Sequence, residues 1–411
     1  MNLFNIIAIL ITLSAVFSYI NYRYIRLPTS IGLMLIALLM SLALIVLKRF
    51  DLDLVPRVAL LLESINFSDT LMHGMLSFLL FAGALHININ DLARQKWVII
   101  TLATLGVLIS TFIVGYTSSW VFGRFGIEVP LIYCMLFGAL ISPTDPIAVL
   151  GILKTVGAPK SLETNIAGES LFNDGIGVVV FIVLLGIATG EHQASFGNVM
   201  GLLAEEVLGG IVFGLVIGAL AFQMLKNIDN YQVEILITLA LVTGGYALAH
   251  ELHVSGPIAI VIAGLLIGNH GRLLAMSDKT CEHLDMFWEL VDEILNGVLF
   301  VLIGLEVLVL TLSINYIVAG VFIIPLVIVA RFISVGLPVT VLRLKREFSP
   351  NAVRIMTWGG LRGGISIALA LSLPGGPERD TILTATYIVV VFSILVQGLT
   401  IGRMVRQAPD S

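Results

Sequence analysis

Charged residues are scarce in this chain. Only 12% of its 411 residues are Asp, Glu, Lys or Arg, whereas a soluble domain carries roughly 25%. The mean hydropathy is +1.04, and 58% of the residues are hydrophobic. This composition excludes a soluble globular protein and predicts an all-α polytopic membrane protein in contact with lipid. The net charge of −5 lies mostly in short connections, and we expect no nucleic-acid partner.

Cysteine is also nearly absent. Cys134 falls in an apolar segment and Cys281 in a connection, so no cysteine metal spacing and no disulfide framework is present. No Lys or Arg precedes the first apolar segment, and we therefore expect that segment to be retained as a helix rather than cleaved as a signal peptide. No connection is long enough to fold as a soluble domain, and we expect no cofactor.

Thirteen apolar segments make up most of the chain. All but the ninth, which is short, have about the length that a bilayer requires. They lie at roughly 3–20, 28–47, 68–86, 97–122, 131–153, 162–188, 197–225, 233–250, 254–269, 286–310, 314–342, 352–373 and 381–402. We expect residues 403–411 to form a short cytoplasmic tail.

The distribution of Lys and Arg predicts the orientation of these segments. With the N-terminus outside, fourteen Lys and Arg fall in connections on the inside and five fall in connections on the outside. This bias predicts thirteen spans with the C-terminus in the cytoplasm. The alternative is twelve spans, with the eighth and ninth segments joined, and it would move the later basic residues to the wrong side.

Two segments are interrupted in the middle. The fifth contains SPTDP at Ser142–Pro146, where two prolines remove backbone donors. The twelfth contains WGGLRGG at Trp358–Gly364, where four glycines loosen the helix. The two breaks are seven segments apart, as expected for two inverted six-helix repeats at about 1–190 and 233–402 joined by a linker helix at about 197–225. Interrupted helices at matching positions of inverted halves indicate a transport site near the bilayer midplane.

The stretch GESLFNDGIGVVVF, at Gly168–Phe181, carries polar residues within the sixth segment. An acid at membrane depth is costly and marks a functional site by default. Helical spacing places Ser170 and Asp174 on one face, and Glu169 and Asn173 on the adjacent face. These side chains therefore predict two polar stripes facing the protein interior. The alternative is that they make structural polar contacts between helices.

Asp145, in the SPTDP break, is the second candidate acid. Hard cations prefer carboxylate, hydroxyl, carbonyl and water oxygens, and Asp145, Asp174, Thr144 and Ser170 supply such a set from two helices. We therefore predict a site for a transported cation, with no resident metal. The alternative for Asp145 is a capping aspartate at a proline kink.

Arg362, in the second break, needs a partner at this depth, and we predict an ion pair with Glu169. Asp174 then remains as the unpaired acid. Burial disfavours the charged form of a carboxyl group and a nearby cation favours it, so one carboxylate can hold either a proton or a cation. We expect the neutral Asn173 to support the unwound helices by hydrogen bonds.

Other charged residues within or next to the segments carry weaker expectations. We expect Arg331 to pair with a helix terminus or with core carbonyls, and Glu306 to make a structural contact. Asp292 and Glu293 fall near a membrane end, where we expect a solvated funnel.

SPTDP on one span, GESLFNDG on the next and GLRGG near the C-terminus together resemble the monovalent cation:proton antiporters of the NhaP and NHE type. The resemblance covers the whole membrane chain. It implies electroneutral exchange of Na+ or Li+ for H+, with Asp174 carrying the ion and the proton and Asp145, Thr144 and Ser170 helping to coordinate the cation. It also implies a structural ion pair between Glu169 and Arg362 and a role for the Asn173–Asp174 pair in electroneutrality.

The resemblance further implies a homodimer in which a core domain moves against a dimerisation domain, and a role in pH homeostasis at a bacterial or archaeal plasma membrane. One position departs from the family pattern. Many members carry an acid in an FE-x-x-L pattern on the third span, where this chain has Ala82 in FAGAL. An extra acidic ligand, or a group lining the access path, is therefore missing here.

The alternatives to Na+/H+ antiport are a K+/H+ antiporter, an intramembrane hydrolase and a channel. A K+/H+ antiporter of the same fold stays open, because the sequence does not rank Na+, Li+ and K+. An intramembrane aspartyl-type hydrolase could use the two aspartates, but the prolines beside Asp145 and the arginine have no role in it. A channel is expected to use a ring of acids or carbonyls from several subunits. We therefore expect a transporter rather than an enzyme.

Overall fold

The computed structural model describes residues 3–47, 67–191, 195–310, 313–344, 348–349 and 351–406. Within these ranges every regular element is a helix, which confirms the predicted fold class. The first half of the chain forms α1 (Leu3–Ile20), α2 (Thr29–Leu47), α4 (Phe67–Asp69), α5 (Leu76–Leu85), α6 (Ile89–Thr101), α7 (Val107–Arg124), α8 (Leu131–Ile141), α9 (Ile147–Val156), α10 (Lys160–Thr189) and α11 (Phe196–Leu225). The second half forms α12 (Tyr231–Glu251), α13 (Gly256–Leu266), α14 (Arg272–Leu274), α15 (Asp278–Leu305), α16 (Ile314–Leu342), α17 (Ala352–Trp358), α18 (Gly364–Leu371), α19 (Pro377–Phe392) and α20 (Gly398–Arg406).

Each predicted apolar segment has a helical counterpart. The eighth and ninth segments are separate helices, α12 and α13, because Ser255 caps the start of α13 with a side chain that accepts from the Ile258 N–H. Two helices begin about eight residues earlier than predicted. Asn88 caps α6 and Ser277 caps α15. The first turns of both helices are polar, so the apolar segment in each begins later than the helix itself. Most of the predicted tail lies outside the described residues.

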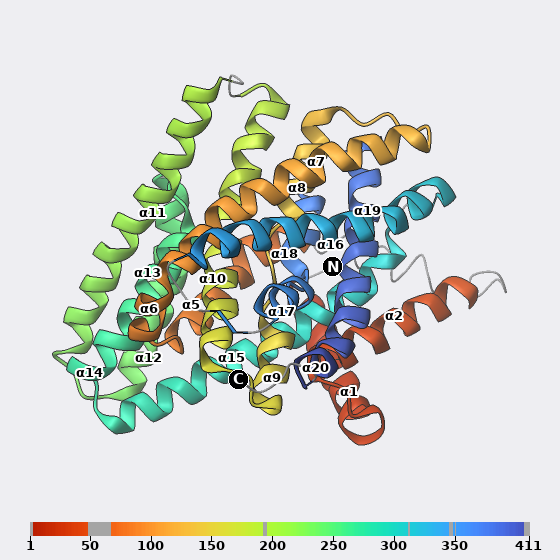
Figure 1. The fold of residues 1–411 in the computed structure, drawn as a ribbon. Helices are drawn as coiled ribbons and strands as arrows, with labels where there is room; N and C mark the ends of the chain where they lie inside the picture. Colours follow the sequence, from red (N-terminus) through yellow and green to blue (C-terminus); the bar gives the residue numbers. More distant parts are fainter. Residues whose placement is uncertain are drawn as a thin grey trace.

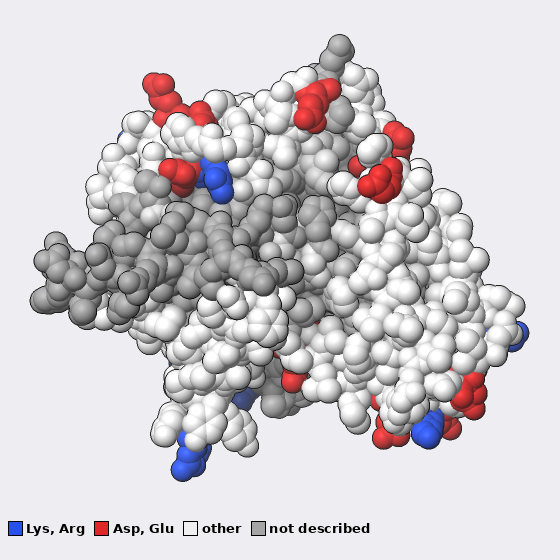
Figure 2. Space-filling model, turned by 180° about the vertical axis from the view of Figure 1, so that it is seen from behind, with Lys and Arg blue, Asp and Glu red and all other residues white. Residues whose placement is uncertain are grey.

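One face of the molecule carries a charge-poor band. Figure 2 shows acidic and basic side chains gathered at two opposite ends, with a largely uncharged surface between them where no grey atoms cover it. Within the described ranges, nine helices are long and apolar enough to cross a membrane. The thirteen-span prediction is compatible with this finding, because some of the remaining apolar segments are short or interrupted helices.

Helix α10 lies centrally in Figure 1, between α11 to α13 on one side and α16 to α19 on the other. It packs against α8 and α6, while α16 packs against α7 and α19. The first half-helix of each broken segment is short, so its end lies inside the protein rather than at a surface. The fold therefore brings the ends of α8 and α17 close to the middle of α10.

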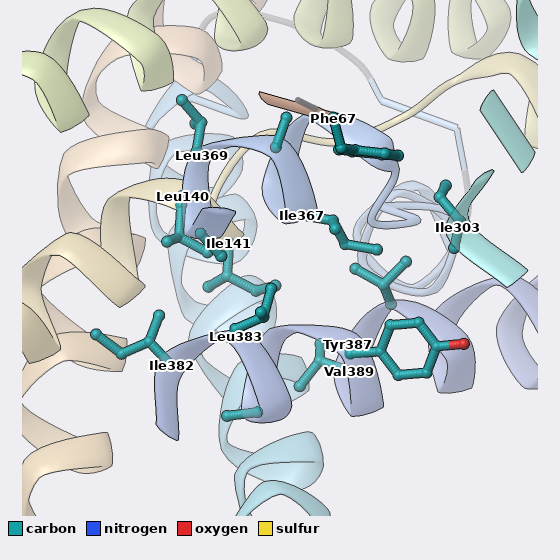
Figure 3. Packing of buried hydrophobic residues seen from close by; sticks show 14 of the residues in the cluster. Phe67, Leu140, Ile141, Ile303, Ile367, Leu369, Ile382, Leu383, Tyr387 and Val389 are labelled. Atoms are coloured by element: carbon teal, nitrogen blue, oxygen red, sulfur yellow. The ribbon is translucent and has the colours of Figure 1, made fainter. Parts of the chain in front are cut away.

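Apolar packing fixes the two half-helices beside this centre. Figure 3 shows Leu140 and Ile141 of α8 near Ile367 of α18, with Leu383 of α19 beneath them. All four side chains are buried in one core cluster. The breaks are thus held between well-packed helical segments, which allows non-helical backbone at membrane depth.

Candidate functional site

The two broken helices meet at their breaks. Between α8 and α9 the chain is non-helical at 142–146, and between α17 and α18 it is non-helical at 359–363. The Asp145 N–H donates to the Leu361 carbonyl at 2.7 Å, and the two residues form an isolated antiparallel bridge. The predicted interruptions are therefore confirmed, and each supplies a backbone partner for the other.

Two glycines allow this close approach. A Cβ atom at Gly363 would lie 2.6 Å from Oδ2 of Asp145, and one at Gly177 of α10 would lie 2.4 Å from Cγ of Pro143. Real Cβ contacts at these distances essentially never occur. Glycine at these two positions lets the second break approach the Asp145 carboxylate and lets α10 approach Pro143.

Hydrogen bonds join α10 to the SPTDP break. The Thr144 N–H donates to Oδ1 of Asn173 at 3.3 Å, and Nδ2 of Asn173 donates to Oγ1 of Thr144 at 2.9 Å. The hydroxyls of Thr144 and Ser170 lie 2.9 Å apart. Because all three side chains are buried, these bonds fix the break against the middle of α10.

The two candidate acids are neighbours at this junction. Asp174 is 8% exposed and lies close enough to Asp145 for their charges to repel. Asp145 directly follows Thr144, whose hydroxyl reaches Ser170. The four predicted cation ligands thus come from one break and one helix and lie in one place, with two carboxylates and two hydroxyls among them.

The ion pair of Glu169 differs from the prediction. Nη1 of Arg331, on α16, donates to Oε1 of Glu169 at 2.5 Å, and Nη2 of Arg331 donates to the Met356 carbonyl at 3.4 Å. Both Glu169 and Arg331 are buried. The predicted pairing of Glu169 with Arg362 was therefore wrong. The signal that could have found Arg331 is its place in the middle of an apolar segment, far from either end.

Arg362 contacts backbone carbonyls instead. Its Nη1 donates to the Ser142 carbonyl at 2.5 Å and to the Pro143 carbonyl at 2.9 Å. These carbonyls follow the end of α8, where the helix has unsatisfied acceptors and the negative end of its dipole. Arg362 is thus positioned to compensate the end of α8.

The whole chain is similar to proteins of one known family. Residues 10–407 match the family model described as sodium/hydrogen exchanger, transmembrane. The Na(+)/H(+) antiporter NhaP of Pseudomonas aeruginosa is 52% identical over 408 residues, which cover 98% of this chain and 96% of that protein. This chain belongs to the sodium/hydrogen exchanger family. It is therefore an integral membrane protein of a transporter family.

One further relative and one solved structure are also similar to this chain. The Na(+)/H(+) antiporter NhaH of Halobacillus dabanensis is 34% identical over 391 residues, covering 94% of this chain and 93% of its own. The solved structure of the sodium proton antiporter MjNhaP1 from Methanocaldococcus jannaschii at pH 8 superposes with a TM-score of 0.79 at 21% identity, covering 99% of both chains. This likeness confirms the exchanger fold.

Within this exchanger fold, the charged side chains near the crossing form two groups. Glu169, Arg331 and Arg362 interact with one another. Asp145 and Asp174 lie close enough for their charges to repel. A proton or a monovalent cation bound between these two carboxylates would relieve the repulsion.

Proposed function

We propose that this protein is a secondary antiporter that exchanges Na+, or Li+, for H+ across the membrane. The observation that carries the proposal is the close approach of two acids, Asp145 and Asp174, at the crossing of the two broken helices. Related proteins of similar length are named Na+/H+ antiporters, which supports the same assignment here. The proposed role is transport without a chemical step, so the protein would not be an enzyme.

The carboxylate of Asp174 would hold the transported ion, with Asp145, Thr144 and Ser170 as further oxygen ligands. Asn173 would support the site by holding Thr144. Glu169 is matched by Arg331, and Arg362 is engaged by carbonyls, so neither is free to change partner with each cycle. Proton and cation would therefore compete for Asp174, and binding of one would expel the other.

The transport cycle would alternate access to this site from the two sides of the membrane. One cation exchanged for one proton moves no net charge, so the membrane potential would not drive the reaction. An exchange that moved one charge would gain about 2.3 kcal/mol per 100 mV. We propose the same two inverted repeats, at about 1–190 and 233–402, as the units around the site, with the helix at about 197–225 as linker.

We further propose a homodimer in the lipid of a bacterial or archaeal plasma membrane, with the N-terminus outside and the C-terminus in the cytoplasm. This orientation rests on the bias of Lys and Arg toward one set of connections. The dimer and the role in pH homeostasis rest on the resemblance of the motifs to the antiporter family.

Proton flux in liposomes containing the purified protein tests the proposal. A pH-sensitive dye inside the vesicles reports the response to NaCl, LiCl or KCl, with the membrane potential clamped or free. We expect Na+ and Li+ to move protons at a rate that ignores the potential. A response to KCl alone would favour a K+/H+ antiporter, and no response to any cation at any pH would overturn the proposal.

Asp174→Asn separates transport by this site from leak. The amide keeps the shape of the carboxylate but cannot exchange a proton, so we expect the flux to fall at least about 100-fold. Competition gives a second signature: where the carboxyl group is mostly protonated, the apparent KM for Na+ should rise about tenfold for each unit that pH falls. If Asp174→Asn exchanges as well as the wild type, the site assignment is wrong.

A further inference from the structure

Asn296 is a buried polar residue that makes no well-formed hydrogen bond within the described part of the chain. It lies on α15 and is 5% exposed, yet neither its amide oxygen nor its amide nitrogen has a hydrogen-bond partner among the described residues. Burying an unpaired amide costs several kcal/mol in an apolar medium, so an unpaired buried amide calls for a physical explanation. A bound cation that accepts this amide oxygen as a ligand is one such explanation.

Asp292 lies one helical turn before Asn296, so the two side chains share a face of α15. Asp292 is half-buried, and the Asn296 side chain lies close enough to act on its carboxylate. The charge of Asp145 also acts on Asp292, as do those of Glu289 and Glu293. A half-buried carboxylate, a buried amide and the Asp145 carboxylate therefore lie near one another.

The same part of α15 contacts the start of α18, where the second break ends. Trp288, one turn before Asp292, packs against Phe81 of α5, with ring centroids 4.7 Å apart. Further along this face of α15, Cδ1 of Leu299 would lie 2.4 Å from a Cβ atom at Gly364. Gly364 directly follows Gly363, the residue against the Asp145 carboxylate. Apolar contacts thus lie on both sides of Asp292 and Asn296 along this face of α15.

We propose that Asp292 and Asn296 form a second subsite for a monovalent cation, which holds the ion before it passes to Asp145 and Asp174. A carboxylate, an amide oxygen and water are the ligands that Na+ shares with other hard cations. The amide of Asn296 accepts a cation but no proton. The subsite therefore selects the cation, while the exchange of cation for proton takes place at Asp174. This inference rests on the proposed function.

The subsite predicts a specific kinetic change. Losing the Asp292 charge lowers the local concentration of cation, so Asp292→Asn should raise the apparent KM for Na+ about fivefold at low salt and leave the maximal rate within about twofold. The difference should shrink at high ionic strength, where screening weakens the field. Glu282→Gln is the matched control: it removes the same charge from an exposed position on the same helix, and its KM should stay at the wild-type value.

Asn296 is tested by substitutions of similar size. Asn296→Leu removes the amide and should raise the KM for Na+ about fivefold while the thermal stability stays equal or rises, because an unpaired buried amide is lost. Asn296→Asp should lower the KM. If Asn296 only supported the fold, Asn296→Leu would lower thermal stability and leave the KM unchanged, which would overturn the proposal.

A binding measurement keeps the subsite separate from transport. Thermal unfolding of the purified protein is titrated with NaCl against choline chloride at equal ionic strength. Na+ should stabilise Asp174→Asn, and this stabilisation should disappear in the double variant Asp174→Asn/Asp292→Asn. If the wild type moves no protons, the proposed function fails but this titration still decides the subsite. An equal Na+ response in both variants would overturn the subsite.

Discussion

Glu169 and Asp174 lie five residues apart on α10, and the fold gives their carboxylates opposite surroundings. Glu169 is 1% exposed and pairs with Arg331 of α16. Asp174 is 8% exposed, and the charge that acts on it comes from another acid, Asp145. A carboxylate matched by an arginine serves as a fixed part of the structure, whereas one that faces another carboxylate requires a proton or a cation. The charge of the neighbouring side chain therefore decides whether a carboxylate of α10 has a structural role or a transport role.

The largest expected effect concerns stability. Arg331→Met should leave Glu169 as an uncompensated charge in the protein interior and lower the free energy of unfolding by about 3–5 kcal/mol. Asp174→Asn should leave stability equal or higher, because it removes a repulsion with Asp145. Thermal unfolding in detergent, together with the yield from membranes, measures both changes.

A double variant controls for loss of packing. Glu169→Gln/Arg331→Met removes both charges and should recover a large part of the stability that Arg331→Met loses, since no buried charge is left alone. Equal losses in the single and double variants would mean that Arg331 acts through its volume and not through its charge. The comparison between the two acids of α10 would then fail.

Arg362 extends the comparison to the second arginine at the crossing. Arg362→Met should leave the Ser142 and Pro143 carbonyls without their donor and cost about 1–3 kcal/mol. Arg362→Lys should recover only part of this loss, because an ammonium group lacks the planar fork of the guanidinium. The expected order of thermal stability is wild type, then Lys, then Met. A lysine variant as stable as the wild type would show that only the charge matters.

Much of this arrangement could be predicted from the sequence. The prolines of SPTDP and the glycines of WGGLRGG are local signals, and both breaks occur where these residues predict them. The pairing of the arginines could not be predicted in the same way. Arg331 and Arg362 lie on different segments. Which of them meets Glu169 depends on where the tertiary fold places α16, and on which carbonyls the end of α8 leaves without a donor. The starts of α6 and α15 could not be predicted from hydropathy, because each helix begins with a polar turn after its capping residue.

Gly363 tests how closely the second break must approach the transport acids. In Gly363→Ala the new Cβ would meet Oδ2 of Asp145 at 2.6 Å, so the carboxylate must shift. A displacement of this kind can cost up to about 100-fold in rate, and we expect the exchange rate to fall about tenfold. Gly375→Ala is the control, because nothing lies within 4 Å of its added Cβ. Similar rates in the two variants would show that Asp145 tolerates the shift.

The smallest expected effect separates ligand hydroxyls from other buried hydroxyls. Ser170→Ala removes one proposed cation ligand and its contact with Thr144, so it should raise the KM for Na+ about threefold and cost about 1 kcal/mol of stability. Ser110→Ala removes a hydroxyl that is also buried but has no partner among the described residues, and it should leave both quantities unchanged. Proton flux and thermal unfolding measured on the two variants provide the comparison. If Ser170→Ala loses stability with no change in KM, the Ser170 hydroxyl only holds Thr144 in place, and the cation is bound by the two carboxylates without it.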